Sequence, residues 1–248
     1  MHTPLPLFCF PYAGGGTAIY RQWADGLPGA VIPIPVHLPG RGPRVQQPPV
    51  QTWPALLDVL LADLHPYMDR PLALFGHSMG ALVAFELAHA MRERYGANPV
   101  WLGLSACVAP ALREWEDKWL HCPRAELLDE LQDLNGTHQE LLRNDEFMAL
   151  VEPVLRADFH LCGVYPREVG RPPLDCPILV LGGTEDKDVC DDSRKLKAWA
   201  SETTGPTELV LLKGDHFFIN TRRDAVLSIV SRSLTGVMHR RRPATCGV

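Results

Sequence analysis

The sequence lacks any run of about eighteen consecutive apolar residues, the length that a membrane-spanning helix requires. It also lacks an excess of positive charge, since 24 Lys and Arg stand against 29 Asp and Glu, a formal net charge of -5. A nucleic-acid-binding domain needs a basic face. We therefore expect neither a membrane nor a nucleic acid among the partners of this chain.

Cysteine patterns typical of metal sites and disulfide frameworks are also missing. The seven cysteines are odd in number, show no C-x-x-C spacing and do not cluster with histidines. We expect no structural disulfide, no metal and no cofactor. The first residues, Met1 to Pro6, lack the positive charges with which a secretory signal begins. These observations favour a reduced cytoplasm as the compartment.

Strand-like apolar runs alternate with helix-like segments along most of the chain. With 46% hydrophobic and 21% charged residues, the 248-residue chain can bury a sizeable core. The alternation predicts an α/β fold with a mostly parallel central sheet flanked by helices. The expected strands are 5–10, 30–37, 71–75, 100–108, 178–181 and 208–212, and the expected helices are 53–68, 81–94 and 222–238.

The alternation stops between residues 110 and 165. This segment is rich in Leu, Glu, Asp and Arg and predicts several short helices without a strand between them. An inserted helical segment beside a sheet is typical of a lid, and a packed subdomain without a gating role is the alternative. We predict a single domain over residues 1–248 with a helical lid insertion at approximately 110–165.

The pentapeptide Gly76-His77-Ser78-Met79-Gly80 matches G-x-S-x-G and lies between a predicted strand and a predicted helix. This context places the serine on a sharp strained turn, where glycines let the strand and the helix approach closely. The helix N-terminus directs free N–H groups toward the place where negative charge develops. Ser78 is therefore the predicted nucleophile of an α/β-hydrolase fold, and His77 is expected to point away from it, with a role in packing or in the pocket.

A serine nucleophile needs a base, and the base needs a carboxylate that fixes its tautomer. His216 follows the last predicted strand, where this fold places its base in the chain order Ser, acid, His. Asp186 follows the preceding predicted strand and is the predicted acid. Asp188 and Glu185 are alternatives in the same loop.

Backbone N–H groups are expected to stabilise the oxyanion that forms after attack. One donor is expected from Met79, which follows the nucleophile. The other is expected from the loop Phe10–Gly16, in which Ala13 carries the best-placed amide. The three glycines of this loop also suggest a phosphate cradle, but the Lys-Ser/Thr of a P-loop is missing.

Several segments resemble the stand-alone type II thioesterases associated with non-ribosomal peptide and polyketide synthesis. They are Phe10–Gly15, Leu38–Arg44, Gly76–Gly80, Gly183–Val189 with Gly214–Phe218, and Leu155–Phe159 followed by Tyr165, which is similar to the lid-end signature of that family. The resemblance spans nearly the whole chain. One departure is Gly42, where members of the family usually carry an acidic residue.

The resemblance implies an enzyme that hydrolyses acyl groups from the phosphopantetheine arm of acyl or peptidyl carrier proteins and so clears aberrant or stalled units. The lid helices would shape the acyl pocket, and a monomer is expected. In the implied mechanism His216 deprotonates Ser78, which attacks the thioester carbonyl while the amides of Ala13 and Met79 hold the oxyanion. Water then hydrolyses the acyl-enzyme.

Other functions remain open at this stage. A carboxylesterase or lipase shares the triad and the fold, and only the loop and lid segments argue against it. An acyltransferase or cyclising thioesterase would replace water by an amine or a hydroxyl, whereas a chain without an attached carrier domain favours hydrolysis. A non-catalytic scaffold that binds carrier proteins is disfavoured by the complete Ser78, Asp186 and His216 set.

A carrier protein would be an acidic helical partner, so basic residues near the expected entrance are candidate contacts. They are Arg41, Arg44, Arg113, Lys118 and Arg124. Charged residues in loops and lids are mostly solvated, so no single one of them is predicted to bind the carrier.

Overall fold

The computed structural model describes residues 4–134, 136, 139–166, 168, 170–189 and 192–240. Six strands of this part form one sheet in the order β2-β1-β3-β4-β5-β6, and each neighbouring pair is parallel. The strands are β1 (Leu5–Phe10), β2 (Val31–Pro35), β3 (Ala73–His77), β4 (Trp101–Ser105), β5 (Ile178–Gly183) and β6 (Thr207–Leu212). The predicted α/β class with a mostly parallel sheet is confirmed.

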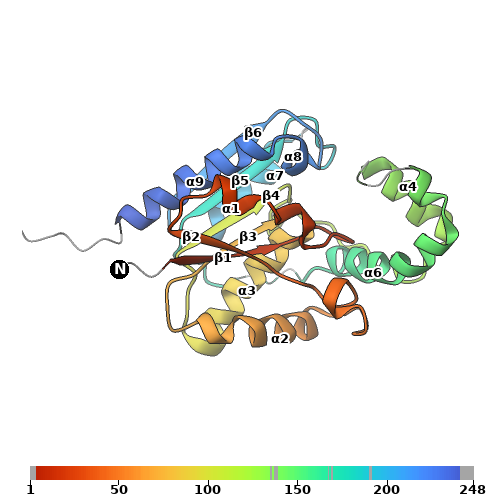
Figure 1. Cartoon of the computed structure of the whole chain (residues 1–248), viewed down its shortest axis with the longest axis horizontal. Helices are drawn as coiled ribbons and strands as arrows, with labels where there is room; N and C mark the ends of the chain where they lie inside the picture. Colours follow the sequence, from red (N-terminus) through yellow and green to blue (C-terminus); the bar gives the residue numbers. More distant parts are fainter. Residues whose placement is uncertain are drawn as a thin grey trace, which may run out of the picture.

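Helices cover both faces of the sheet (Figure 1). Residues of α2 and α3 build the core on one face, and residues of α1 and α9 build the core on the other. The helices are α1 (Trp23–Gly26), α2 (Trp53–Leu64), α3 (Met79–Tyr95), α4 (Arg124–Leu134), α5 (Gln139–Leu142), α6 (Asp145–Gly163), α7 (Arg194–Lys197), α8 (Phe218–Thr221) and α9 (Arg223–Arg240). Within the described residues, no helix is both long enough and apolar enough to cross a membrane.

Two predicted element boundaries differ from the structure for local reasons. β4 ends at Ser105 rather than at residue 108, because Ala106 adopts a positive φ of 52° and turns the chain out of the strand. The predicted helix 53–68 ends as an α-helix at Leu64 and continues as the 3-10 turn His65–Tyr67, where Pro66 interrupts the α-helical hydrogen bonds.

Helix α3 is the central helix of the molecule. All of its residues from Met79 to Met91 are buried, which is typical of a helix that is enclosed on every side. It packs on β3 and against α2. The residue that precedes α3, Ser78, is therefore attached to a rigid part of the core.

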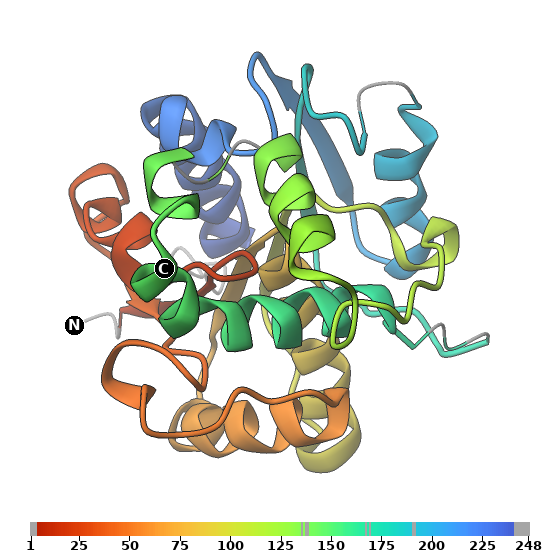
Figure 2. The same cartoon turned by 90° about the vertical axis from the view of Figure 1, so that its right-hand side faces the viewer.

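The described residues between β4 and β5 contain helices but no strand, as the sequence predicted. In Figure 2 these helices, α4 to α6, lie in front of the sheet, beyond the carboxyl ends of its strands. They share a small apolar cluster that is separate from the two main cores, with Trp119, Leu127, Leu131 and Met148 among its members. Residues 135, 137 and 138 of the predicted insertion lie outside the described part, and its action as a lid remains a prediction.

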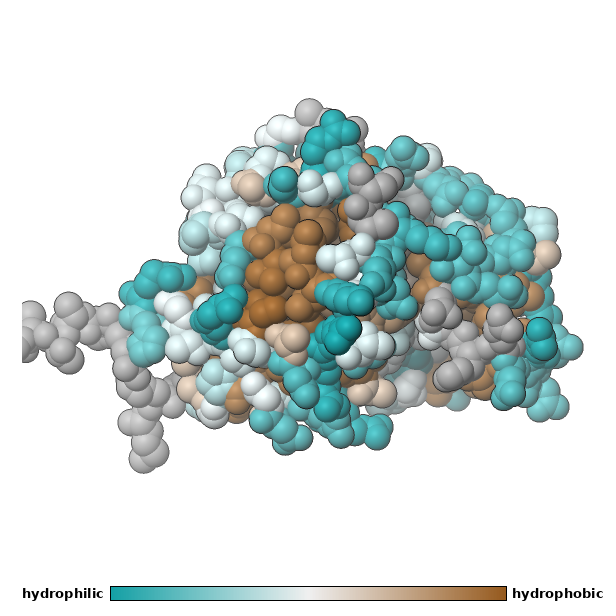
Figure 3. All heavy atoms as spheres, turned by 90° about the horizontal axis from the view of Figure 1, so that it is seen from above, coloured by the Kyte–Doolittle hydropathy of each residue, from teal (hydrophilic) through white to brown (hydrophobic). Residues whose placement is uncertain are grey.

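The two edges of the sheet differ in how they face solvent. β2 carries Pro33 and Pro35, which have no N–H group to offer to a further strand. β6 has no proline, and its Leu211 is 50% exposed. Figure 3 shows hydrophobic side chains gathered on the face where β6 and α9 lie.

Backbone contacts at the junction of β3 and α3 require two glycines. A Cβ atom on Gly76 would lie 1.8 Å from the carbonyl oxygen of Gly80, and one on Gly80 would lie 2.1 Å from the carbonyl oxygen of Phe10. Both neighbours are backbone atoms of buried elements, so they cannot move aside as a flexible side chain does.

We therefore predict that Gly76→Ala lowers the free energy of unfolding by about 3 kcal/mol or more. Urea denaturation followed by circular dichroism measures the change. Gly29→Ala is the matched control, because a Cβ atom there meets nothing within 4 Å, and it should stay within about 0.5 kcal/mol of the original protein. Equal stability of the two variants would contradict the packing described here.

Candidate active site

Ser78 occupies a strained turn between β3 and α3. Its φ of 56° and ψ of -121° lie in a region that residues other than glycine rarely adopt. The turn is held from both sides, because the Ser78 N–H donates to the Ser105 carbonyl at 2.7 Å and the Ser78 carbonyl accepts from the Ala81 N–H at 2.9 Å. The side chain of Ser78 lines a cavity beyond the carboxyl ends of the strands.

The structure brings the three predicted triad residues together. His216 Nε2 lies 2.9 Å from Ser78 Oγ, and His216 Nδ1 lies 3.0 Å from Asp186 Oδ2. Asp186 follows β5 and His216 follows β6, so two neighbouring strand ends present them side by side. A carboxylate only accepts hydrogen bonds, so Nδ1 carries the proton and Nε2 is free to accept the Ser78 proton.

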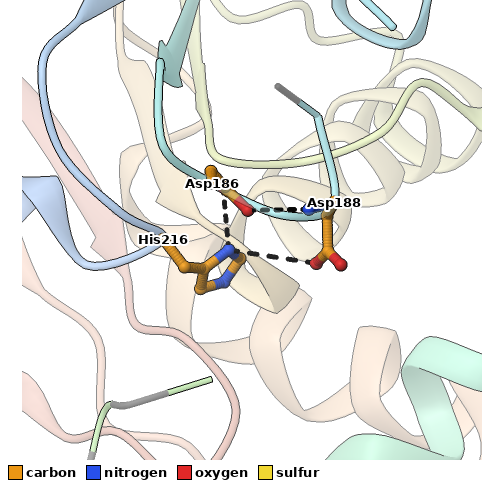
Figure 4. Close-up of side chains that lie close together, drawn as sticks. All are labelled: Asp186, Asp188 and His216. Atoms are coloured by element: carbon orange, nitrogen blue, oxygen red, sulfur yellow. Dashed lines mark hydrogen bonds and ion pairs between the residues drawn. The ribbon is translucent and has the colours of Figure 1, made fainter. Parts of the chain in front are cut away.

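Figure 4 shows both Asp186 and Asp188 beside His216, and burial and distance select Asp186 as its partner. Asp186 is buried, whereas the Asp188 side chain is 58% exposed and its Oδ2 lies 4.0 Å from His216 Nδ1. The Asp188 N–H instead donates to Asp186 Oδ1 at 3.1 Å, which holds the carboxylate in place. Glu185, the other alternative, is exposed.

Asp186, Asp188 and His216 also form a group with the spacing of metal ligands in the described part of the chain, with ligand atoms within 4.8 Å of one another. Two of these ligand atoms, Asp186 Oδ2 and His216 Nδ1, are hydrogen-bonded to each other. The other ring nitrogen of His216 faces Ser78. The arrangement is that of an acid, a base and a nucleophile in sequence.

The pKa of His216 is set by opposing effects. Burial lowers it, but the hydrogen bond to Asp186 and the negative charges of Asp186, Asp188 and Asp215 outweigh burial and raise the pKa above its ordinary value of 6.5. A histidine whose imidazolium is stabilised by a carboxylate is suited to accept a proton and then return it.

His77 supports the loop that carries the base. Its Nε2 lies 2.9 Å from the His216 carbonyl oxygen, and its Nδ1 lies 2.8 Å from Ser105 Oγ. The carbonyl only accepts, so Nε2–H donates to it and Nδ1 accepts from the serine hydroxyl. Burial lowers the pKa of His77 well below its ordinary value, so the ring is neutral.

The two residues predicted to supply the oxyanion donors both lie beside Ser78 in the lining of the cavity. Met79 begins the 17-residue helix α3, and Ala13 lies in the loop after β1; both line the cavity. Among the hydrogen bonds of the described residues, none uses the amide of Ala13 or of Met79. β1 and β3 are neighbours at the point where the strand order reverses, which is where α/β sheets bind ligands. The predicted oxyanion donors therefore lie at the same strand ends as the predicted nucleophile.

The cavity has a volume of about 770 Å³ and extends from Ser78 to the helices of the inserted segment. Much of its far wall is apolar. That wall includes Leu131, Leu142, Phe147, Met148, Val151, Leu155 and Phe159. Cys107 also lines the cavity, but burial raises the pKa of its thiol to about 11, so it is not a thiolate at neutral pH.

The basic residues considered as carrier contacts all have partners within the chain. Arg41 pairs with Asp158, Arg44 with Asp63, Arg113 with the Cys162 carbonyl, Lys118 with Glu116 and Glu126, and Arg124 with Asp145. The Arg41–Asp158 pair is the most buried of these five ion pairs. In the sequence, Asp158 is only one residue of the lid-end segment Leu155–Phe159, and no motif or spacing connects it to the active site.

Comparison with known proteins places this geometry in a family. The family model described as "Thioesterase domain" matches residues 5–234. LgrE of Brevibacillus parabrevis is 38% identical over 231 residues, which cover 92% of this chain and 87% of LgrE. RedJ, a thioesterase from the prodiginine pathway of Streptomyces coelicolor, superposes with a TM-score of 0.84 at 36% identity and covers 93% of this chain and 90% of its own.

YbtT, a type II thioesterase from the yersiniabactin NRPS/PKS pathway, superposes with a TM-score of 0.82 at 31% identity, over 95% of this chain and 94% of its own. These similarities confirm the expected α/β-hydrolase fold. The full name of LgrE, "Linear gramicidin dehydrogenase LgrE", designates a different activity. A Rossmann dehydrogenase carries G-x-G-x-x-G after its first strand; here the segment Gly14–Ile19 reads GGGTAI and lacks the third glycine.

The raised pKa of His216 predicts the pH dependence of the reaction. Neutral imidazole is the base, so kcat/KM should fall as the pH drops through a pKa above 6.5. Asp186→Asn should lower kcat on the order of 10³- to 10⁴-fold, because the tautomer and the imidazolium lose their support. Hydrolysis of a p-nitrophenyl ester across pH measures both effects.

Asp188→Asn is the matched control, because it removes a charge near His216 without removing a hydrogen bond to the ring. It should keep most of kcat and shift the acid limb of the pH profile to lower pH. Comparable losses of kcat in Asp186→Asn and Asp188→Asn would overturn the choice of Asp186 as the acid.

Proposed function

This chain belongs to the thioesterase domain family and is a thioester hydrolase; we propose that it removes acyl groups from the phosphopantetheine arm of carrier proteins. The observation that carries the proposal is the hydrogen-bonded set Ser78, His216 and Asp186 at the floor of a large cavity whose far wall is apolar. An acyl chain fits the apolar wall, and its thioester carbonyl reaches Ser78. The activity proposed is the clearance of aberrant or stalled acyl units.

The related proteins support the choice of substrate class. RedJ and YbtT are named as thioesterases of biosynthetic pathways, and YbtT as a type II enzyme of an NRPS/PKS pathway. The partner we propose for this chain is accordingly an acyl or peptidyl carrier protein of such a synthase. We further propose a cytoplasmic monomer, and the free cysteines of the described part, such as Cys9 and Cys176, are compatible with a reducing compartment.

The proposed mechanism assigns one task to each group. His216 Nε2 takes the proton of Ser78 Oγ as the oxygen attacks the thioester carbonyl, and the amides of Ala13 and Met79 receive the oxyanion. As the tetrahedral intermediate collapses, the C–S bond breaks and His216 returns the proton to the sulfur. Asp186 stabilises the imidazolium that exists between these two steps.

Water completes the reaction on the acyl-enzyme. His216 takes a proton from the water, and the water oxygen attacks the carbonyl of the acyl group that is esterified to Ser78 Oγ. When this second intermediate collapses, the proton passes to Ser78 Oγ and the carboxylic acid leaves. A thiol is more acidic than an alcohol, so the first step requires less protonation of its leaving group than cleavage of an oxygen ester.

The proposal predicts a preference for carrier-bound thioesters. Wild-type protein should release free thiol from an acetyl-phosphopantetheinyl carrier protein more efficiently than it hydrolyses a p-nitrophenyl ester. Ser78→Ala should reduce both rates by at least about 10³-fold, because the triad acts as a unit. Thiol release is followed with a thiol-reactive dye and ester cleavage by the absorbance of p-nitrophenol.

The outcomes separate this function from its alternatives. Efficient ester cleavage with an untouched carrier thioester would indicate a carboxylesterase or lipase. Binding of the carrier protein without Ser78-dependent turnover of either substrate would indicate a scaffold. Consumption of the thioester without free acid, when an amine or alcohol is supplied, would indicate an acyltransferase.

A further inference from the structure

The inserted segment makes a direct polar contact with the loop after β1. Asp158, on α6, accepts a hydrogen bond from the Gly14 N–H through Oδ2 at 2.7 Å. The same carboxylate forms a two-point ion pair with Arg41, with Nη1–Oδ2 at 2.6 Å and Nη2–Oδ1 at 2.7 Å. Arg41 Nη1 also donates to the Gly15 carbonyl at 3.1 Å. The ion pair therefore contacts two successive residues of this loop.

An apolar contact one turn away on α6 supports the polar one. Leu155 and Asp158 are three residues apart and lie on the same face of the helix. A Cβ atom on Gly14 would lie 2.4 Å from a terminal methyl of Leu155, and Gly14 has a positive φ of 71°. The loop therefore meets α6 at a distance and in a conformation that only glycine accommodates well.

The Arg41–Asp158 ion pair is largely buried, so it adds little to the stability of the fold but fixes the orientation of both side chains. The side chains of Arg41 and Asp158 are 12% and 4% exposed. Desolvation of two charges offsets much of their attraction, whereas a two-point guanidinium–carboxylate contact fixes both groups in one orientation. Neither Arg41 nor Asp158 forms a hydrogen bond with the triad in the described part of the chain, so either residue would influence the reaction only through the loop after β1.

Four successive peptide units of the loop, from Tyr12–Ala13 to Gly15–Gly16, take part in hydrogen bonds. The Gly15 N–H donates to the Tyr12 carbonyl at 2.8 Å, and the Tyr12 carbonyl belongs to the same planar peptide unit as the Ala13 N–H. Asp158 holds the next unit through the Gly14 N–H, and Arg41 holds the Gly15 carbonyl. The direction of the Ala13 N–H is therefore determined by the hydrogen bond to its own peptide unit and by those to the units that follow.

We propose that Asp158, held by Arg41, is a positioning residue that sets the direction of the Ala13 N–H in the oxyanion hole. This inference rests on the proposed function, in which Ala13 donates to the oxyanion. Because Asp158 belongs to α6, the helix that closes the inserted segment also orients one of the two donors. Loss of the carboxylate should impair the transition state more than the binding of substrate.

The test compares Asp158→Ala and the nearly isosteric Asp158→Asn on an octanoyl-pantetheine thioester and on p-nitrophenyl octanoate. Asp158→Ala should lower kcat about 10- to 100-fold on both substrates with little change in KM, because the donor is displaced rather than removed. Asp158→Asn should lose less, since its amide oxygen still accepts from Gly14. Thermal melts establish that each variant is folded.

Inhibitor binding distinguishes positioning from general loosening of the structure. A trifluoromethyl ketone analogue forms a tetrahedral oxyanion on Ser78, and its affinity should fall by about the same factor as kcat/KM. A thioether analogue, which carries no such oxyanion, should bind with unchanged affinity. Asp63→Ala is the matched control for Asp158→Ala, because it removes the carboxylate that accepts from the neighbouring Arg44, and no hydrogen bond of the described residues 12–16 involves Asp63. It should leave kcat unchanged.

Wild-type kcat in Asp158→Ala, or an equal loss of affinity for the ketone and the thioether, would overturn the inference. The same loss of kcat in Asp63→Ala would also overturn it, because the loss of any arginine–carboxylate pair in this region would then lower kcat. Failure of the wild-type protein to cleave the thioester while it cleaves the ester would refute the proposed function instead. The ester data would then still decide the role of Asp158.

Discussion

The close approach of α3 to β1 and β3 is the constraint on which the rest of the site depends. Gly76 and Gly80 allow backbone atoms to meet where any side chain would clash, and the turn between them forces Ser78 into a positive φ. Such strain costs on the order of 1–3 kcal/mol. It persists because α3 is buried on all sides, so the turn cannot relax without disrupting the core.

Two buried carboxylates at this end of the sheet have opposite electrostatic tasks. Asp158 faces Arg41, a cation at every accessible pH, so its charge is permanently matched and serves geometry. Asp186 faces His216, whose neutral form is the base and which becomes a cation when it takes the Ser78 proton. A permanent cation beside Asp186 would neutralise its charge and so weaken its attraction for the imidazolium. The two tasks therefore require two separate carboxylates.

The sequence predicted the parts of the site that depend on local turns after strands. Ser78, Asp186 and His216 each follow a strand end, and parallel strands deliver such ends to one edge of the sheet, so order and context indicated that they would meet. The Arg41–Asp158 pair joins residues 117 positions apart, one in a loop and one on a helix, with no periodicity to connect them. Only the packing of α6 against the loop after β1 brings them together.

Arg41 illustrates the limit of reading charge from sequence. A basic residue in a loop suggests an exposed contact for an acidic partner, because most such residues are solvated. Here the Arg41 side chain is 12% exposed, and its N–H groups donate to Asp158 and to the carbonyls of Pro39 and Gly15. Whether a side chain is buried depends on the whole fold and not on the residue type. Arg41, a candidate docking residue from the sequence, is therefore part of the internal hydrogen-bond network instead.

The cavity is lined by two parts of the molecule with separate hydrophobic clusters. The triad and the Met79 amide lie at strand ends and at the start of α3, whereas much of the apolar wall belongs to helices with their own small cluster. Changes in that wall can alter the acyl chain that fits without moving Ser78 or His216. Changes in the wall still affect the reaction at Ser78, because α6 carries both Leu155, which lines the wall, and Asp158, which contacts the loop that contains Ala13. A substitution that shifts α6 to admit a larger chain would therefore also shift the proposed oxyanion donor Ala13, so one helix would couple acyl selection to rate.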